Sequence, residues 1–268
     1  MDHVYLALIG LLAGLAGGLL GIGGSIVMIP GMNELFGLNQ HLHQAAAMIV
    51  NFFVVVPAAY QHARARAIVW PIVRGMAPAA MAAVIIGVAV SETSLFAGRN
   101  EVYLTGLFGL FMGYVALADL VRLIRRKQAA DNPEPFKVSS WKAALLVGVP
   151  TGMIAGLLGV GGGIIMVPLQ RRILRIPLRM AIANSATTII ALSLIGASMK
   201  NYAVISEGIS PWWKALGMAA ILIPTAMCAA FLGGKLTHTL PVKHIRLAFI
   251  LLLFVFAVRM CYRAASAL

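Results

Sequence analysis

The sequence predicts an all-α polytopic membrane protein built from two inverted repeats of five helical segments each. The first observation is composition: 61% of the 268 residues are hydrophobic and only 11% are charged, whereas soluble domains contain about 25% charged residues. The second is that several apolar runs approach the ~20 residues that a helix needs to cross a bilayer. The third is a glycine-rich stretch that occurs near the start of each half.

The doubled stretch reads GLAGGLLGIGGSIVMIP over residues 14–30 and GMIAGLLGVGGGIIMVP over residues 152–168. One constant offset in the numbering relates the two copies, so that Gly14 pairs with Gly152 and Gly23 with Gly161. Each glycine inside a helix costs roughly 1 kcal/mol relative to alanine, so two matched clusters need a reason beyond filling a membrane span. We predict that each copy breaks a membrane helix and forms a re-entrant glycine hinge.

The first repeat, residues 1–124, is expected to hold five helical segments, at residues 4–20, 26–36, 45–61, 69–90 and 102–123. The second segment is too short to span, because at about 1.5 Å per residue it covers only about half of a ~30 Å hydrocarbon core. The polar stretch before the third segment contains His41 and His43. We expect this stretch to be a loop, and without a third ligand nearby it gives no metal site.

The second repeat, residues 141–268, follows the same plan, with segments at residues 143–158, 164–174, 177–199, 213–232 and 242–262. Its second segment is again too short to span the hydrocarbon core. Between the repeats, residues 125–140 combine basic residues with prolines, a composition typical of a solvated linker.

The distribution of lysine and arginine predicts the topology. If the chain starts outside, five of its 21 basic residues lie outside and the other 16 lie on the cytoplasmic side, as the positive-inside rule requires. Both termini are then outside and the linker is cytoplasmic. The loops after the two short segments fall on opposite sides, which makes the repeats inverted, and inverted repeats with broken helices are typical of secondary transporters. The five outside residues are Arg99, Lys200, Lys214, Arg259 and Arg263.

Several other functions are disfavoured by composition. The basic residues behind the formal charge of +13 lie between apolar runs rather than in a basic stripe. Membrane topology explains this distribution, and no nucleic-acid partner is expected. Cys228 and Cys261 have neither disulfide nor metal-ligand spacing. No cofactor, metal or catalytic residue is predicted. A membrane-embedded enzyme is a weak alternative, because no cluster of nucleophilic or ionisable residues falls within the spans.

The doubled LLGIGGSIVMIP and LLGVGGGIIMVP motifs resemble those of the TauE/SafE sulfite-exporter family, over essentially the whole chain. The resemblance implies a transporter of small sulfur-containing anions, or related organic acids, in the bacterial cytoplasmic (inner) membrane. An anion channel of the same architecture remains the main alternative. The implied partners are the anionic substrate and the lipid bilayer, with a coupling proton or cation and a homodimer left open.

The hinges suit a small anion chemically. A helix N-terminus offers unpaired N–H groups and a positive partial charge, and glycine lets the backbone approach the anion closely. Close helix packing is the alternative role for such glycines, and we favour it for Gly14, Gly18 and Gly152. The residues assigned to the anion site are Gly21, Gly23, Gly24 and Ser25 in the first hinge, and Gly159, Gly161, Gly162 and Gly163 in the second.

A polar group in the second repeat is expected to complete the site. Asn184, Thr187 and Thr188 share a helix face because they lie three and four residues apart, and Ser185 lies beside them. Hydroxyls that bond back to their own helix are the alternative, so Asn184 is the better candidate. Asn51 is the nearest polar residue that the first repeat offers. Lys200 lies near a span end, where snorkelling to the interface is the expected role.

Overall fold

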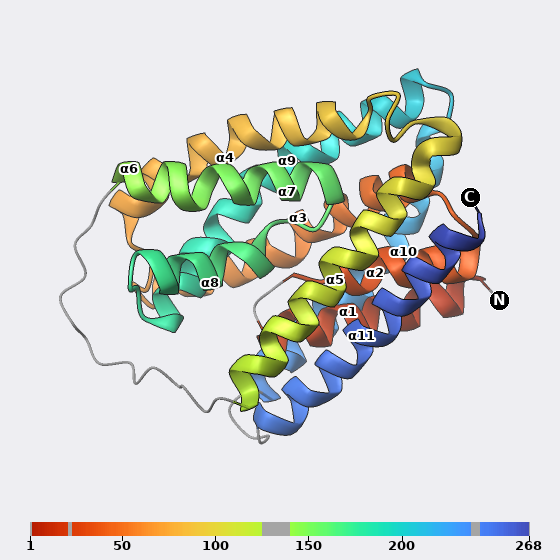
Figure 1. Ribbon diagram of the computed structural model, residues 1–268. Coiled ribbons are helices and arrows are strands. Elements are labelled where there is room, and N and C mark those ends of the chain that lie inside the picture. The colour runs from red at the N-terminus through yellow and green to blue at the C-terminus, as the bar shows by residue number, and fades with distance from the viewer. Residues whose placement is uncertain (1, 21–22, 125–139, 237–241, 268) are drawn as a thin grey trace.

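The computed structural model describes residues 2–20, 23–124, 140–236 and 242–267 (Figure 1). These residues form helices and contain no strand. The elements are α1 (Asp2–Leu20), α2 (Ser25–Phe36), α3 (Gln40–Arg64), α4 (Trp70–Ser91), the 3₁₀ helix η1 (Gly98–Asn100), α5 (Glu101–Ile124), α6 (Ser140–Lys142), the π-helical η2 (Ala143–Gly148), α7 (Val149–Leu158), α8 (Gly163–Ile173), α9 (Leu178–Ser206), α10 (Trp212–Leu236) and α11 (Val242–Ser266).

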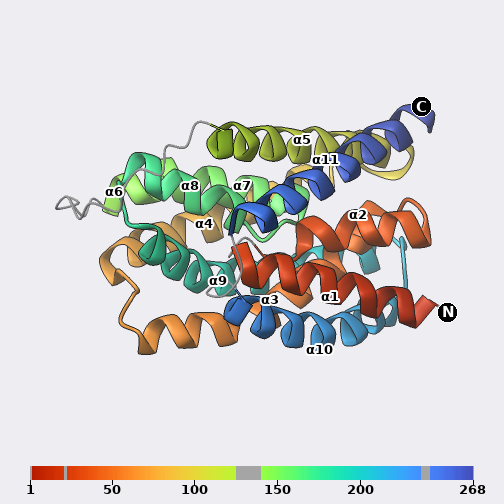
Figure 2. The same ribbon diagram turned by 90° about the horizontal axis from the view of Figure 1, so that it is seen from below.

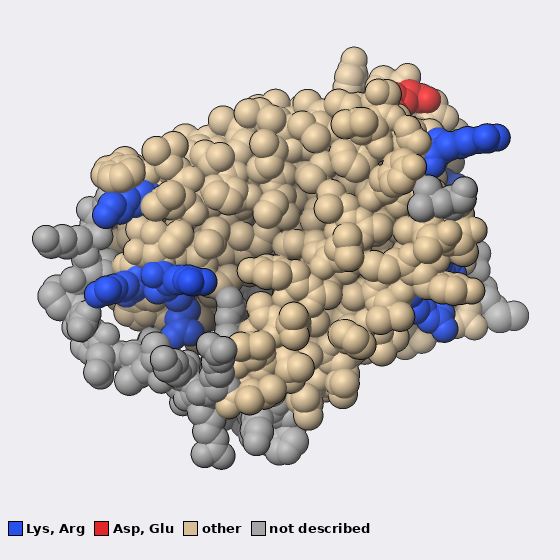
Figure 3. Space-filling model, viewed as in Figure 1, with Lys and Arg blue, Asp and Glu red and all other residues tan. Residues whose placement is uncertain are grey.

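The helices confirm an all-α polytopic membrane protein. Within the described ranges, seven helices are long and apolar enough to cross a bilayer, and α1 contributes a shorter apolar stretch, His3–Gly18. On the face shown in Figure 3, lysine and arginine lie at the two ends of the molecule, and the broad band between them is uncharged. Such a band is what contact with lipid requires, because charged side chains are costly in the bilayer core.

The long helices associate in four pairs, and each pair joins one helix from residues 2–124 to one from residues 140–266. The pairs are α1 with α10, α4 with α7, α5 with α11, and α3 with α9. In Figure 2 the α5–α11 pair lies along one side of the molecule, away from α10. Both termini lie at one end, here called the termini end, and the helix formed by α6, η2 and α7 starts at the opposite end (Figure 1).

Two glycine stripes hold the first two of these pairs together. Gly10, Gly14 and Gly18 of α1 lie so close to the α10 backbone that a Cβ on any of them would overlap α10 atoms. Three glycines of the η2–α7 helix, at the equivalent positions of the second repeat, make the same approach to α4; they are Gly148, Gly152 and Gly156. The structure therefore confirms close packing as the role of Gly14, Gly18 and Gly152.

This packing predicts opposite effects for two glycine-to-alanine substitutions. Gly152→Ala should lower the free energy of unfolding by about 1–3 kcal/mol, because its methyl group would overlap the Ala80 backbone. Gly217→Ala, in the exposed part of α10 with open space around it, should stabilise the protein by up to about 1 kcal/mol through helix propensity. Thermal unfolding in detergent measures both, and equal shifts for the two variants would contradict the packing role.

Two expectations about the third segment and Lys200 were wrong. The stretch with His41 and His43 is not a loop but the first turns of α3, because the Asn39 side chain caps the helix by accepting a hydrogen bond from the Leu42 N–H at 3.1 Å. Lys200 does not snorkel, because α9 continues to Ser206 and buries it completely. The expected linker lies, but for Ser140, outside the described residues.

Candidate functional site

Both glycine hinges interrupt a helix, as expected. Gly23 separates α1 from α2 with a φ of +84°, and Gly159, Gly161 and Gly162 separate α7 from α8 with φ values of +70°, +67° and +81°. Residues with a Cβ are disfavoured in this left-handed region, which explains why the sequence places glycine at each of these positions. Gly21 lies outside the described residues.

The hinges leave the N-termini of α2 and α8 without side-chain caps. The N-cap residues are Gly24 and Gly162, which have no side chain to accept a hydrogen bond from the first N–H groups of the helix. The first N–H groups of a helix have no partner within that helix. Ser25 at the start of α2 and Gly163 at the start of α8 therefore stand where an anion could accept hydrogen bonds.

The side chain of Asn51, in the middle of α3, lies between the two hinges. A Cβ built on Gly161 would come within 2.6 Å of Asn51 Nδ2, and a Cβ on Gly23 would lie 3.7 Å from Asn51 Oδ1. Asn51 Nδ2 also donates a 2.9 Å hydrogen bond to Ser25 Oγ, and both residues are almost fully buried. The side-chain amide of Asn51 therefore lies next to both hinges.

Three side chains that lie against the second hinge each contain a buried polar atom without a hydrogen-bond partner in the described structure. Buried polar groups in proteins are nearly always paired, so a cluster of unpaired ones indicates a place for a ligand. Three of its glycines each face one such side chain, within the described structure: Gly159 faces Gln44 (Oε1 unpaired), Gly161 faces Asn51 (Oδ1 unpaired) and Gly162 faces Thr151 (Oγ1 unpaired).

These side chains can supply donors to an anion. The NH₂ groups of Gln44 and Asn51 each carry two hydrogens. One hydrogen of each is used, by the Leu157 carbonyl oxygen and by Ser25 Oγ, and the second is available to an anion. The hydroxyl of Thr151 can donate directly. Ser25 Oγ accepts the bond from Asn51, which leaves its own hydrogen as a further donor.

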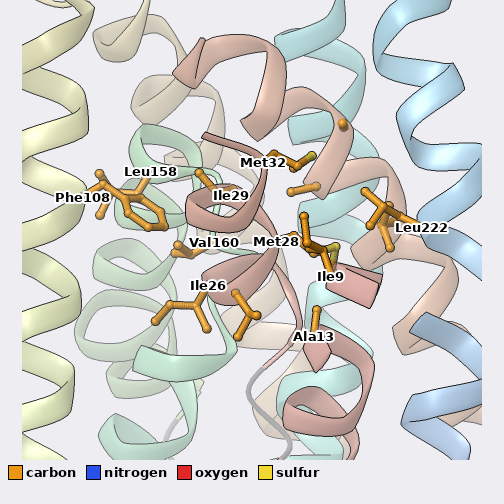
Figure 4. Close-up of a cluster of buried hydrophobic side chains, with 14 of the residues drawn as sticks. Ile9, Ala13, Ile26, Met28, Ile29, Met32, Phe108, Leu158, Val160 and Leu222 are labelled. Atoms are coloured by element: carbon orange, nitrogen blue, oxygen red, sulfur yellow. The ribbon is translucent and has the colours of Figure 1, made fainter. Parts of the chain in front are cut away.

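Apolar packing encloses the site. Figure 4 shows Ile26 and Ile29 of α2 beside Leu158 and Val160 of the second hinge. All four belong to one buried cluster, and Ile26, Ile29 and Val160 have no exposed surface. Because the surroundings have a low dielectric constant, hydrogen bonds and helix dipoles act more strongly on a charge there than in water.

Three of the four polar residues expected on α9 already have partners near the start of that helix. Asn184 Nδ2 donates to Gln170 Oε1 at 3.0 Å, and Asn184 Oδ1 accepts from the Val69 N–H at 2.8 Å, so this amide connects α8, α9 and the start of α4. Thr187 and Thr188 each donate to the carbonyl oxygen four residues earlier. Ser185 is buried and its hydroxyl has no partner in the described structure. Their part in anion binding stays a prediction.

The sequence analysis did not identify two side chains that lie at the second hinge, Gln44 and Thr151. Gln44 was placed in a loop, although its seven-residue spacing from Asn51 puts both on one face of a helix. Thr151 occupies the position in the second repeat that Ala13 occupies in the first, and Ala13 contacts the first hinge at Gly24 in the same way. Comparing polar with apolar residues at equivalent positions of the two repeats would have identified it.

Comparisons with known proteins agree with the membrane architecture. The family described as "Sulfite exporter TauE/SafE" matches residues 6–260. "Probable membrane transporter protein MamO" of Magnetospirillum gryphiswaldense is 30% identical over 90% of this chain. The match covers 42% of MamO, so the chain spans less than half the length of that relative.

Two further relatives match along most of their own length. "Probable membrane transporter protein MJ0441" of Methanocaldococcus jannaschii is 26% identical, over 90% of this chain and 89% of its own. A "Probable membrane transporter protein" of Haemophilus influenzae is 28% identical, over 94% and 96%. No solved structure matches the chain.

Proposed function

Because the chain belongs to the TauE/SafE family of sulfite exporters, we propose that it moves small sulfur-containing anions across the bacterial cytoplasmic membrane by alternating access. The family establishes a membrane transporter. The observation that carries the finer proposal is the set of unpaired polar atoms around the second hinge, beside two uncapped helix N-termini. A sulfite or sulfonate group has several acceptor oxygens and a negative charge, which matches these donors and the positive helix ends.

Alternating access requires a binding site that both sides reach in turn. Asn51, Ser25, Gln44 and Thr151 are each at most 1% exposed, so helices must move before an anion can enter. A channel in its open state would have a continuous path through the same site. The buried position therefore favours a transporter over a channel.

Inverted repeats offer a means for this movement. The helix packing follows the repeat. In the first repeat α1 packs on α10, and in the second repeat α7, the counterpart of α1, packs on α4, the counterpart of α10. In addition, α1 and the helix that ends in α7 start from opposite ends of the molecule (Figure 1). Both observations support a pseudo-two-fold axis in the membrane plane, about which repeats can rock. With the charge distribution, this arrangement supports a topology in which both termini are outside.

A flux panel in proteoliposomes tests the proposal. We expect saturable flux, with exchange of anions across the membrane, for at least one of sulfite, thiosulfate, sulfoacetate and taurine, compared with small carboxylates. Liposomes without protein give the background rate. Flux that does not saturate and shows no exchange would indicate a channel, and preference for carboxylates over every sulfur compound would contradict the proposed substrate class.

A further inference from the structure

A group of ionisable side chains is buried at the termini end, away from the glycine hinges. Lys200 Nζ lies 2.8 Å from Glu92 Oε1 and donates to Ser91 Oγ at 2.6 Å. His41 Nδ1 lies 3.2 Å from the same Glu92 oxygen and 3.5 Å from Lys200 Nζ. The side chains of Lys200, His41 and Glu92 are 0%, 2% and 13% exposed, so only the carboxylate reaches the surface.

Glu92 and Lys200 form an ion pair in this cluster. Burial raises the pKa of Glu92, but its contacts with His41 and the charge of Lys200 outweigh burial and lower the pKa to about 2. Glu92 is therefore an anion that offsets the charge of Lys200. Glu101 accepts a hydrogen bond from the His41 backbone N–H at 3.1 Å, and the carboxylates of Glu101 and Glu207 also act on Lys200.

A backbone carbonyl determines which ring nitrogen of neutral His41 carries the hydrogen. His41 Nε2 lies 3.0 Å from the Phe96 carbonyl oxygen, which can only accept, so Nε2 carries a hydrogen. In neutral His41 the lone pair therefore sits on Nδ1, where Lys200 is the available donor. When a proton is added, Nδ1–H instead donates to Glu92, and the unpaired Glu92 Oε2 leaves this carboxylate further capacity to stabilise the positive charge.

We propose that His41, held between Glu92 and Lys200, is a proton-binding site that couples anion transport to the pH gradient. Histidine is the side chain that normally gains or loses a proton between pH 5 and 8. The proton enters from the termini end past Glu92 and binds Nδ1, and Lys200 keeps its bonds to Ser91 and Glu92. The coupling role rests on the proposed anion transport, whereas proton binding itself does not.

The ligand of this cluster is a proton rather than a metal cation. The Lys200 ammonium already occupies Glu92 Oε1 at 2.8 Å, where a metal would have to bind the carboxylate. No group of three or more His, Cys, Asp or Glu side chains that could hold a metal occurs in the described part of the chain. A proton needs only the lone pair on His41 Nδ1, and the Glu92 carboxylate beside it offsets the added charge.

One face of α3 connects the proton site to the hinges. His41, Gln44, Met48 and Asn51 follow at intervals of three, four and three residues, so they lie along a single face. At a rise of about 1.5 Å per residue, His41 lies about 15 Å from Asn51 along the helix axis. Between them Met48 contacts Gly196 of α9, one turn before Lys200. A shift of α3 against α9 would therefore change both sites together.

The coupling is tested by thiosulfate flux into proteoliposomes with and without an imposed pH gradient, since thiosulfate keeps its charge between pH 5 and 8. In the wild-type protein the gradient should change the initial rate. In His41→Gln, which can still donate to Phe96 but cannot bind the proton, the two rates should become equal. His43→Gln is the matched control, because His43 faces Asn33, and it should keep the difference. A wild-type gradient effect in His41→Gln would overturn the proposal.

Nitrogen NMR of histidine-labelled protein tests proton binding without any transport. The His41 signal is identified by its loss in His41→Gln, and its Nδ1 should gain a proton as the pH is lowered while Nε2 stays protonated. In Glu92→Gln the titration midpoint should shift to lower pH because the carboxylate is lost. If His41 Nδ1 does not titrate, the proton site is wrong. If it titrates but no anion of the panel moves, the transport proposal fails instead.

Discussion

Replacing Gly161 by alanine is expected to reduce anion flux at least tenfold while the protein still inserts into the membrane. Its Cβ would come within 2.6 Å of Asn51 Nδ2 and only 3.8 Å from the Ile189 side chain on the other side. Asn51 would have to leave its place between the hinges, and the anion would lose that donor. A tenfold loss corresponds to about 1.4 kcal/mol of binding free energy, less than the value of one buried hydrogen bond to a charged group.

Backbone strain has to be separated from this loss of space. Alanine at a φ of +67° costs about 1–2 kcal/mol wherever it occurs, so Gly161→Ala is destabilising as well. Gly208 has the same φ of +67°, and a Cβ there meets no atom within 4 Å. Gly208→Ala should therefore show the fall in melting temperature that backbone strain alone causes, but wild-type flux. Wild-type flux in Gly161→Ala, or equal loss in both variants, would argue against an anion site at the hinge.

Much of the fold follows from sequence because the bilayer restricts the choices. Only helices and closed barrels can span it, so apolar run length predicts most helix ends to within a few residues. An exception is α9, which continues past the predicted end at residue 199 to Ser206. The doubled glycine motif gives the positions of both helix breaks. The start of α3 was missed because its first turns are polar, and polarity in a membrane protein was taken as exposure. Those turns are buried against other helices instead of against lipid.

The polar shell of the site was harder to predict, because sequence shows which residues are polar but not which have partners. Asn184 looked like the best candidate, yet Gln170 and Val69 occupy both ends of its amide. Gln170 belongs to the preceding helix, α8, and Val69 is in the other repeat, so no local pattern reveals either contact. The same limit hid the cluster of Lys200, Glu92 and His41, which come from three separate parts of the chain.

At one pair of equivalent positions, the residues of the two repeats can be exchanged with each other to test the site. Asn51 and Ile189 occupy equivalent positions of the two repeats, and both lie beside Gly161, one from each side. Asn51→Ile should abolish measurable anion binding, because it replaces an amide donor with an apolar side chain. The larger side chain also overpacks the site, which typically costs about 1–3 kcal/mol. Loss of binding in this variant alone therefore has two causes.

The double variant Asn51→Ile with Ile189→Asn separates them. Exchanging the two residues conserves the total volume beside Gly161 and returns an amide to the same glycine from α9 instead of α3. We expect it to recover part of the thiosulfate affinity lost in Asn51→Ile, measured by thermal shift in detergent, since an amide beside the hinge is what the anion needs. Recovery of the melting temperature without recovery of affinity would mean that Asn51 only fills space. Wild-type affinity in the single variant would remove Asn51 from the site, because its bond to Ser25 would then serve the fold alone.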